Sequence, residues 1–243
     1  MRYADLHLCV PWANLEHAKP LIVKSAELGY SQIGVPLPHS VRDETVDILR
    51  EICDDNGLDF VTRVDLAARS AGELLTGLSR FRKKFEVVAV LCSSKAVARQ
   101  AAKDRRVDLL DFQLSDARKQ FFDRAEAELA SGSGAGFEVD LAKVLGHLAV
   151  SSGVGIFSRL RREVAIAKSS GVPVVFSSGT SDPRLLRKPQ DYAALASLFH
   201  TDESHALQAL SVHPAKIVER NREKQSSEYV APGVRVVREA GSR

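Results

Sequence analysis

The chain has little cysteine and few aromatic residues, and it holds no long apolar run. Its three cysteines, Cys9, Cys53 and Cys92, lie far apart and form no CxxC pair, which argues against a disulfide frame or a thiolate zinc site. Aromatic residues make up only 6%, so nothing resembles an aromatic-studded RNA-binding sheet. A membrane span needs about 18 consecutive apolar residues, and neither such a run nor a signal-peptide pattern is present. The sequence therefore predicts a cytoplasmic protein with no membrane partner.

What the chain does contain is the composition of an ordinary soluble protein, with 44% hydrophobic and 27% charged residues. A length of 243 residues fits one α/β barrel as well as two small domains. The net charge is only +3, but it is unevenly distributed. Residues 1–60 hold ten acids and five bases, whereas residues 151–190 hold seven bases and two acids. Such asymmetry permits one basic face that could bind phosphate groups.

Short apolar strands alternate with helical stretches along most of the chain. The predicted strands are 3–10, 31–37, 58–66, 85–92, 107–114, 135–141 and 172–179. The predicted helices between them are 15–29, 41–56, 70–83, 94–105, 116–130 and 153–170. This alternation indicates parallel pairing with right-handed crossovers, and seven such units favour a closed barrel over an open sheet.

The C-terminal part departs from this alternation. After Gly179 no eighth strand is recognisable, and the sequence predicts helices at about 189–199, 203–210 and 214–224. The predicted fold is therefore a TIM-like (β/α) barrel, distorted, with seven clear strands plus C-terminal helices. Residues 1–222 are expected to form a single barrel domain, and residues 223–243 a polar tail.

Polar residues recur at alternate positions of the predicted strands, near the end of the barrel where barrel enzymes keep their sites. In strand 3–10, alternation places Asp5 and His7 inside the barrel, and Leu6 and Leu8 against the helices. The later strands carry polar residues of the same parity. The predicted cluster at the barrel mouth consists of Asp5, His7, Arg63, Asp65, Asp111, Glu138, Asp140 and Ser178.

Two interpretations of this mouth cluster stand side by side. Carboxylates plus an imidazole could hold a divalent metal and activate water, as in a hydrolase. The alternative is an internal network of ion pairs in which Arg63 neutralises the acids. His7 is the only histidine on a predicted inward strand face, which is few for a metal centre. We therefore expect the ion-pair network, with no catalytic residue and no metal on this chain.

A dense group of basic residues flanks the last predicted strand. A solvated surface and contact with RNA phosphates explain this group equally well. The candidates for RNA contact are Arg159, Arg161, Arg162, Arg184, Arg187 and Lys188. A second stripe, made of Lys95, Arg99, Lys103 and Arg106, is more typical of the exposed face of a helix.

Several segments together resemble one known family over nearly the whole chain. They are residues 3–10, the run VPVVFSSG at 172–179, the run LRKPQDY at 186–192 and the run ALSVHPAKIVERN at 209–221. In this order and spacing they resemble the archaeal ribonuclease P protein component 3, which is homologous to the eukaryotic thirty-kilodalton subunit. The resemblance implies a noncatalytic barrel subunit that assists a catalytic RNA in removing 5′ leaders from precursor tRNA. It implies as partners the ribonuclease P RNA, precursor tRNA and another ribonuclease P protein subunit. The magnesium that the holoenzyme needs would then be bound by the RNA.

That family is related to the PHP phosphoesterase barrels, which open with aspartate-leucine-histidine-x-histidine as part of a metal site. Here the corresponding run is Asp5-Leu6-His7-Leu8-Cys9, so a cysteine replaces the second histidine. The departure agrees with the shortage of inward histidines. The alternative function is an independent, metal-dependent phosphoesterase of this type.

Overall fold

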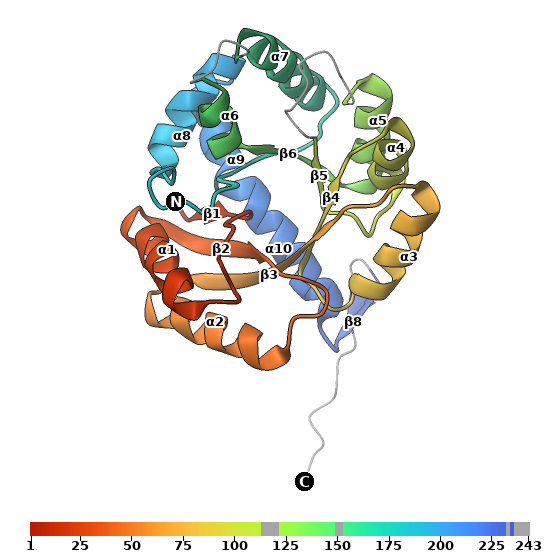
Figure 1. The fold of residues 1–243 in the computed structure, drawn as a ribbon. Coiled ribbons are helices and arrows are strands. Elements are labelled where there is room, and N and C mark those ends of the chain that lie inside the picture. Colours follow the sequence, from red (N-terminus) through yellow and green to blue (C-terminus); the bar gives the residue numbers. More distant parts are fainter. Residues whose placement is uncertain (113–121, 149–152, 232–233, 236–243) are drawn as a thin grey trace.

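A computed structural model describes residues 1–112, 122–148, 153–231 and 234–235. Seven parallel strands pair in sequence order and form a nearly closed barrel with helices around it (Figure 1). The strands are β1 (Tyr3–Asp5), β2 (Tyr30–Pro36), β3 (Asp59–Leu66), β4 (Val87–Leu91), β5 (Leu109–Asp111), β6 (Gly136–Asp140) and β7 (Val174–Ser177). The predicted TIM-like architecture is confirmed.

Helices follow the strands and cover the outside of the barrel. The first five are α1 (Leu15–Glu27), α2 (Asp43–Asp55), α3 (Ala71–Phe81), α4 (Lys95–Lys103) and α5 (Arg124–Ser133). The others are α6 (Leu141–Leu148), α7 (Gly153–Ser169), α8 (Pro189–Ala196), α9 (Glu203–Ala209) and α10 (Val212–Gln225). The helix at 141–148 was not predicted, because it follows β6 without a loop. Nowhere in the described ranges is a helix long and apolar enough to cross a membrane.

Local signals in the sequence explain where the helices begin and end. The side chains of Ser70 and Ser94 cap α3 and α4 by accepting hydrogen bonds from backbone N–H groups of the first turn. Asp123 and Glu126 form a reciprocal capping box at the start of α5. The same helix ends at Gly134, whose φ of 83° suits glycine. These caps define the helix boundaries by local hydrogen bonds that do not depend on tertiary packing.

The barrel interior is apolar at one end and polar at the other. At the end where the strands begin, interior residues of β3, β4, β5 and β7 form a small apolar cluster. Ile217 and Val218 of α10 belong to this cluster, so α10 closes that end; Figure 1 shows it crossing behind the strands. Towards the ends of the same strands the interior positions are polar. Register pairs Arg63 with Val87 and Asp140 with Ser177 across neighbouring strands.

The barrel is closed between β1 and β7 by an irregular contact instead of an eighth strand. Leu8 and Thr180 form an isolated parallel bridge, and the Gly179 N–H donates to the His7 carbonyl at 2.8 Å. The regular part of the first strand ends at Asp5, earlier than the predicted residue 10. Its alternation ends there too, and Leu6 packs with the interior apolar cluster. The prediction that Leu6 faces the helices is therefore wrong.

The C-terminal residues partly lie within described elements. Helix α10 continues to Gln225, and a short hairpin follows, in which β8 (Tyr229–Ala231) pairs antiparallel with β9 (Val234–Arg235). Residues 236–243 of the predicted tail lie outside the described residues.

Substitution of Gly34 on β2 tests the irregular path of the first strand. A Cβ at Gly34 would lie 2.6 Å from the Leu6 carbonyl oxygen and 2.9 Å from the Leu6 Cα. Because both atoms are backbone, Gly34→Ala should lower the free energy of unfolding by about 1–3 kcal/mol, measured by urea titration. The matched control is Gly132→Ala in α5, where a Cβ meets nothing within 4 Å. That change should raise stability by about 0.5–1 kcal/mol. Equal effects of the two substitutions would contradict the close approach of β1 and β2.

Candidate functional site

Arg63 lies at the centre of the barrel mouth. Its side chain comes from β3, is fully buried, and donates to both carboxylate oxygens of Glu138 at 2.7 Å each. Its Nε donates to Asp65 Oδ1 at 2.7 Å, and its Nη1 also reaches the Leu6 carbonyl at 2.8 Å. The Ser177 hydroxyl donates to Glu138 at 2.7 Å. A planar guanidinium is suited to this task, because it serves several acceptors in fixed directions and stays charged.

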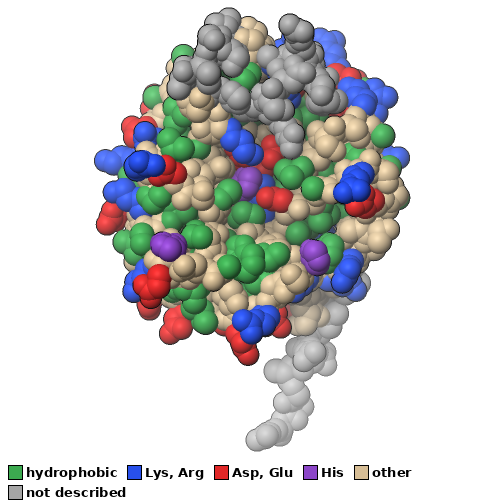
Figure 2. All heavy atoms as spheres, viewed as in Figure 1, with side chains coloured by type: hydrophobic (Ala, Val, Ile, Leu, Met, Phe, Trp, Pro, Cys, Tyr) green, Lys and Arg blue, Asp and Glu red, His purple; other side chains and the backbone are tan. Residues whose placement is uncertain are grey.

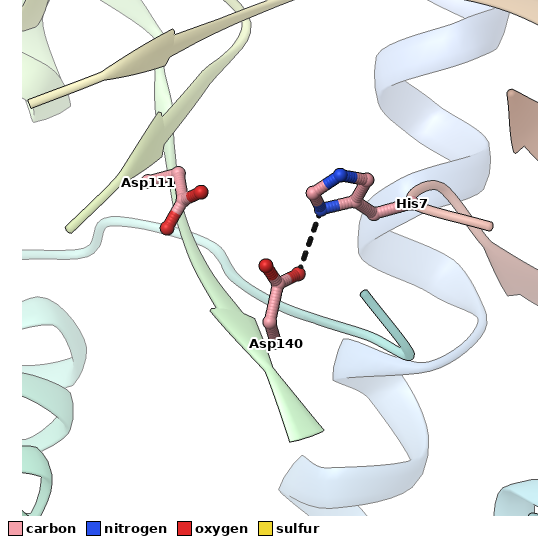
Figure 3. Close-up of side chains that lie close together, drawn as sticks. All are labelled: His7, Asp111 and Asp140. Carbon is pink, nitrogen blue, oxygen red and sulfur yellow. Dashed lines mark hydrogen bonds and ion pairs between the residues drawn. The ribbon is translucent and has the colours of Figure 1, made fainter. Parts of the chain in front are cut away.

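His7 bridges two acids of the same cluster. Its Nδ1 lies 2.8 Å from Asp140 Oδ1 (Figure 3), and its Nε2 lies 3.3 Å from Asp65 Oδ2. Burial and the charge of Arg63 lower the pKa of His7, but the carboxylates of Asp140 and Asp65 outweigh them and raise it well above 6.5. The two carboxylates that face the ring nitrogens therefore favour the imidazolium form of His7.

Lys143 completes the cluster from α6. Its ammonium group pairs with Asp140 Oδ2 and lies 3.7 Å from Asp111 Oδ2. Burial alone would raise the pKa of Asp140, but the charges of His7 and Lys143 lower it to about 2. Burial and the nearby Asp140 carboxylate raise the pKa of Asp111 to about 7. Sequence reasoning missed Lys143; its signal is the i, i+3 spacing from Asp140 in a helix that starts directly after a strand.

The charges of this mouth cluster come close to balancing. Asp65, Glu138 and Asp140 supply three negative charges, and Arg63, His7 and Lys143 supply three positive ones. Asp111, whose pKa is about 7, is partly protonated at neutral pH. Acidic, basic and histidine side chains meet in the middle of this face in Figure 2. The buried charges are thus compensated by opposite charges within the cluster, as burial of charged groups requires.

A divalent metal fits this arrangement poorly. Ligand atoms of His7, Asp111 and Asp140 lie within 4.8 Å of one another (Figure 3), which is the spacing of a metal site. However, the Lys143 ammonium pairs with Asp140 beside Asp111, and His7 Nδ1 faces Asp140 as well. A metal ion would have to displace this ammonium and remove the protons from His7 and Asp111. The geometry therefore favours the ion-pair interpretation of the mouth.

Asp5 and Ser178 of the predicted cluster lie outside this network and instead join the end of β1 to the residues that follow β7. Asp5 Oδ1 accepts hydrogen bonds from the backbone N–H groups of Ser178 at 2.9 Å and His7 at 3.1 Å. The Ser178 hydroxyl donates to the His7 carbonyl at 3.3 Å. The expectation that Asp5 and His7 are buried is confirmed. The structure thus brings together His7, Arg63, Asp65, Asp111, Glu138 and Asp140.

One of the predicted RNA-contacting residues is buried, and the others are exposed. Arg159 is only 4% exposed and pairs with Glu163 inside the protein at 3.1 Å, so its placement on a surface was wrong. The reason is helical spacing: Arg159 falls on the inner face of α7, whereas Arg161 and Arg162 are exposed. Arg161 donates to the Leu198 carbonyl at 2.8 Å.

The later members of the set also make local contacts. Arg184 pairs with Asp182 at 2.8 Å, and the Arg187 guanidinium donates to the carbonyls of Arg184 and Leu186. Lys188 is exposed at the start of α8. Contact of RNA by the exposed members remains a prediction.

The fold and the mouth together define a parallel α/β barrel whose candidate site is occupied by its own ion pairs. The sequence profile of the family described as RNase P subunit p30 matches residues 2–226, and the chain belongs to this family.

Curated relatives agree with this assignment, and solved structures match the fold. The chain is 28% identical over 213 residues to ribonuclease P protein component 3 of Methanosarcina mazei, covering 88% of this chain and 86% of that protein. It is 27% identical over 244 residues to the protein of the same name from Methanothermobacter thermautotrophicus, covering 99% and 97%. Its fold matches a chain in a cryo-EM structure of archaeal ribonuclease P with mature tRNA, with a TM-score of 0.81 at 20% identity, covering 98% of this chain and 100% of that chain. A lactonase from Listeria monocytogenes matches less closely, with a TM-score of 0.51 at 10% identity, covering 89% and 94%.

Replacement of Arg63 by methionine should be strongly destabilising. The change leaves Glu138 and Asp65 buried without their cation, and loss of one partner of a buried pair costs about 3–5 kcal/mol. Urea unfolding at neutral pH measures the loss. The double variant Arg63→Met, Glu138→Gln should recover part of it, because one uncompensated charge is gone. A double variant no more stable than Arg63→Met would show that the pair is not coupled as described.

The mouth cluster also predicts how stability depends on pH. The folded state raises the pKa of His7 above 6.5, so it binds the proton more tightly than the unfolded chain does. This stabilisation is complete below pH 6.5 and is lost as pH rises through the folded pKa. Above pH 6.5 the free energy of unfolding should therefore fall by up to about 1.4 kcal/mol per pH unit on account of His7. His7→Asn should remove that slope in urea titrations at stepped pH; an unchanged slope would refute the imidazolium.

Asp111→Asn is the matched control for the pH series. The folded pKa of Asp111 is about 7 against an ordinary 3.8, so its proton too is held more tightly in the folded state. The contribution of this proton to the free energy of unfolding is lost between about pH 4 and pH 7. The two variants should thus flatten the stability curve in different pH windows.

Proposed function

We propose that this chain is a noncatalytic protein subunit of ribonuclease P, which assists a catalytic RNA in removing 5′ leaders from precursor tRNA. The observation that carries the proposal is the family match over residues 2–226. The similarity extends over 97% of one archaeal component 3.

The barrel mouth supports a noncatalytic role. Barrel enzymes use this end of the strands for chemistry. Here Arg63, His7 and Lys143 neutralise the acids that could otherwise bind a metal or act as bases. A general base needs a free proton-accepting group with a pKa near the working pH. Asp140 is tied to two cations, and Asp111, whose pKa of about 7 would suit the task, has the Lys143 ammonium 3.7 Å from its Oδ2.

The proposal includes the partners and the cofactor. The chain would bind the ribonuclease P RNA directly, act on precursor tRNA only within the complex, and pair with another ribonuclease P protein subunit. Magnesium would belong to the RNA, and no cofactor to this chain. The working compartment would be the cytoplasm, in agreement with the free cysteines Cys9, Cys53 and Cys92.

Affinity isolation of the tagged, full-length chain from its native cells, followed by sequencing of the RNA that accompanies it, tests the proposal. We expect enrichment of one structured RNA that cleaves precursor tRNA in the isolated complex with magnesium. Mass spectrometry of the same sample should identify further protein subunits. The control is the same tag on an unrelated protein of similar size. No enriched RNA, or an isolate that leaves precursor tRNA intact, would contradict the proposal.

The alternative phosphoesterase is tested on the purified chain. The trio of His7, Asp111 and Asp140 is the observation that favours it. Elemental analysis for zinc and manganese is combined with turnover of a chromogenic phosphate ester. A stoichiometric metal, with turnover that His7→Ala abolishes, would establish the phosphoesterase and remove the noncatalytic assignment.

A further inference from the structure

A basic pocket lies at the end of the barrel opposite the mouth. It is formed by the loops that lead into β4 and β5 together with the last turns of α10, and its volume is about 470 Å³. Five basic side chains line it: Arg82, Lys83, Arg105, Arg106 and Lys224. The remaining lining residues are the amides Asn221 and Gln225, so the described part of the chain contributes no acid and no apolar residue to the lining.

The basic side chains of this pocket divide into fixed and free groups. Arg82 pairs with the buried Asp108 and donates to the carbonyls of Phe85 at 2.8 Å and Glu86 at 2.7 Å. Arg106 pairs with Asp104 at 2.7 Å. By contrast, Lys83, Arg105 and Lys224 are exposed, and no carboxylate of the described residues pairs with any of them.

Helix dipoles account for only part of this positive charge. Helices α3, α4 and α10 all end beside the pocket, and basic residues near helix C-termini are a common stabilising feature. Each helix end carries about half a negative charge, so three ends supply about 1.5. Three unpaired cations exceed that amount, so the pocket keeps a positive potential.

The basic groups are close enough to disturb one another. Partial burial and the charge of Arg220, together with Arg82 and Arg105, lower the pKa of Lys224. Arg220 is itself fixed, since it donates to Asp108 and to the Gly134 carbonyl at 2.8 Å each. An anion in the pocket would relieve this repulsion, as a phosphate group does among clustered arginines and lysines.

We propose that this pocket binds phosphate groups of an RNA backbone, and that Lys83, Arg105 and Lys224 make the contacts. The inference rests on the proposed function, because it places the RNA surface of a ribonuclease P subunit at the closed end of the barrel. Arg82 and Arg106 are positioning residues that hold the two loops around the pocket.

The composition of the lining favours RNA over an acidic protein partner. Stable protein interfaces have an apolar core with aromatic or aliphatic anchors, and this lining has none. Phosphate contacts, in contrast, come from arginine, lysine and side-chain amides, which are the residue types present here. Such contacts position the RNA without selecting its sequence.

The test is a triple variant, Lys83→Gln, Arg105→Gln and Lys224→Gln, in the reconstituted complex. The probe is the transcribed RNA that accompanies the wild-type chain from its cells, and the readout is affinity across a salt series. Each phosphate contact contributes about 0.7–0.9 to the salt slope, so loss of three should reduce the slope by about two units or more. Affinity at low salt should weaken as well.

A matched control carries the same loss of charge elsewhere. Lys19→Gln, Arg42→Gln and Arg69→Gln remove three exposed basic side chains on other parts of the chain, and the salt slope should stay as in wild type. Thermal unfolding of both variants comes first; if the pocket variant is destabilised, its three single variants are compared instead.

An unchanged slope in a complex that still processes precursor tRNA would overturn this inference and leave the proposed function intact. Unchanged RNA affinity with loss of a protein subunit would overturn it too, in favour of a protein contact. A wild-type chain that binds no RNA would instead overturn the proposed function.

Discussion

The buried guanidinium of Arg63 is the interaction on which the barrel mouth depends. It lies inside the barrel without exposure and holds Glu138, Asp65 and the Leu6 carbonyl in place. Strands β3 and β6 and the residue that follows β1 are thereby tied together across the interior by one side chain. Because an unpaired charge at this depth is costly, the positions of the acids around Arg63 follow from it. His7 and Lys143 then extend the same alternation of charge to Asp140 and Asp111.

This network explains how a barrel can keep a polar mouth in which the charges compensate one another. The side chains His7, Asp111 and Asp140 are of the kinds that bind metals, and they lie close together. A covalently attached ammonium group, that of Lys143, pairs with one of the two acids and lies beside the other. The ammonium group of Lys143 is part of the chain and is held next to these acids by the fold. A metal ion must bind from solution and compete with it. The mouth thus retains polar residues as structural pairs.

The two ends of the barrel therefore differ in charge for a physical reason. At the mouth, acids from strand ends and bases from β3 and α6 compensate each other. At the opposite end, the helix C-termini favour basic residues, and the acids of the described residues that pair with bases around the pocket are Asp104 and Asp108. The overall net charge of +3 does not reveal this difference in charge between the two ends of the barrel. The excess positive charge is thus left where two loops and three helix ends meet, which is a surface suited to a polyanion.

The sequence by itself determined the seven-strand barrel and most of the mouth cluster, because strand alternation sorts side chains by face whenever a strand is regular. Alternation failed at Leu6, where the first strand ends early, and it could not place Lys143 on a helix that begins without a loop. Only the tertiary structure decided that Arg159 is buried against Glu163. The same holds for the pocket, since Lys83 and Lys224 lie about 140 residues apart in the chain. Periodicity describes one element at a time, whereas a surface built from three elements exists only after the strands have set the positions of their loops.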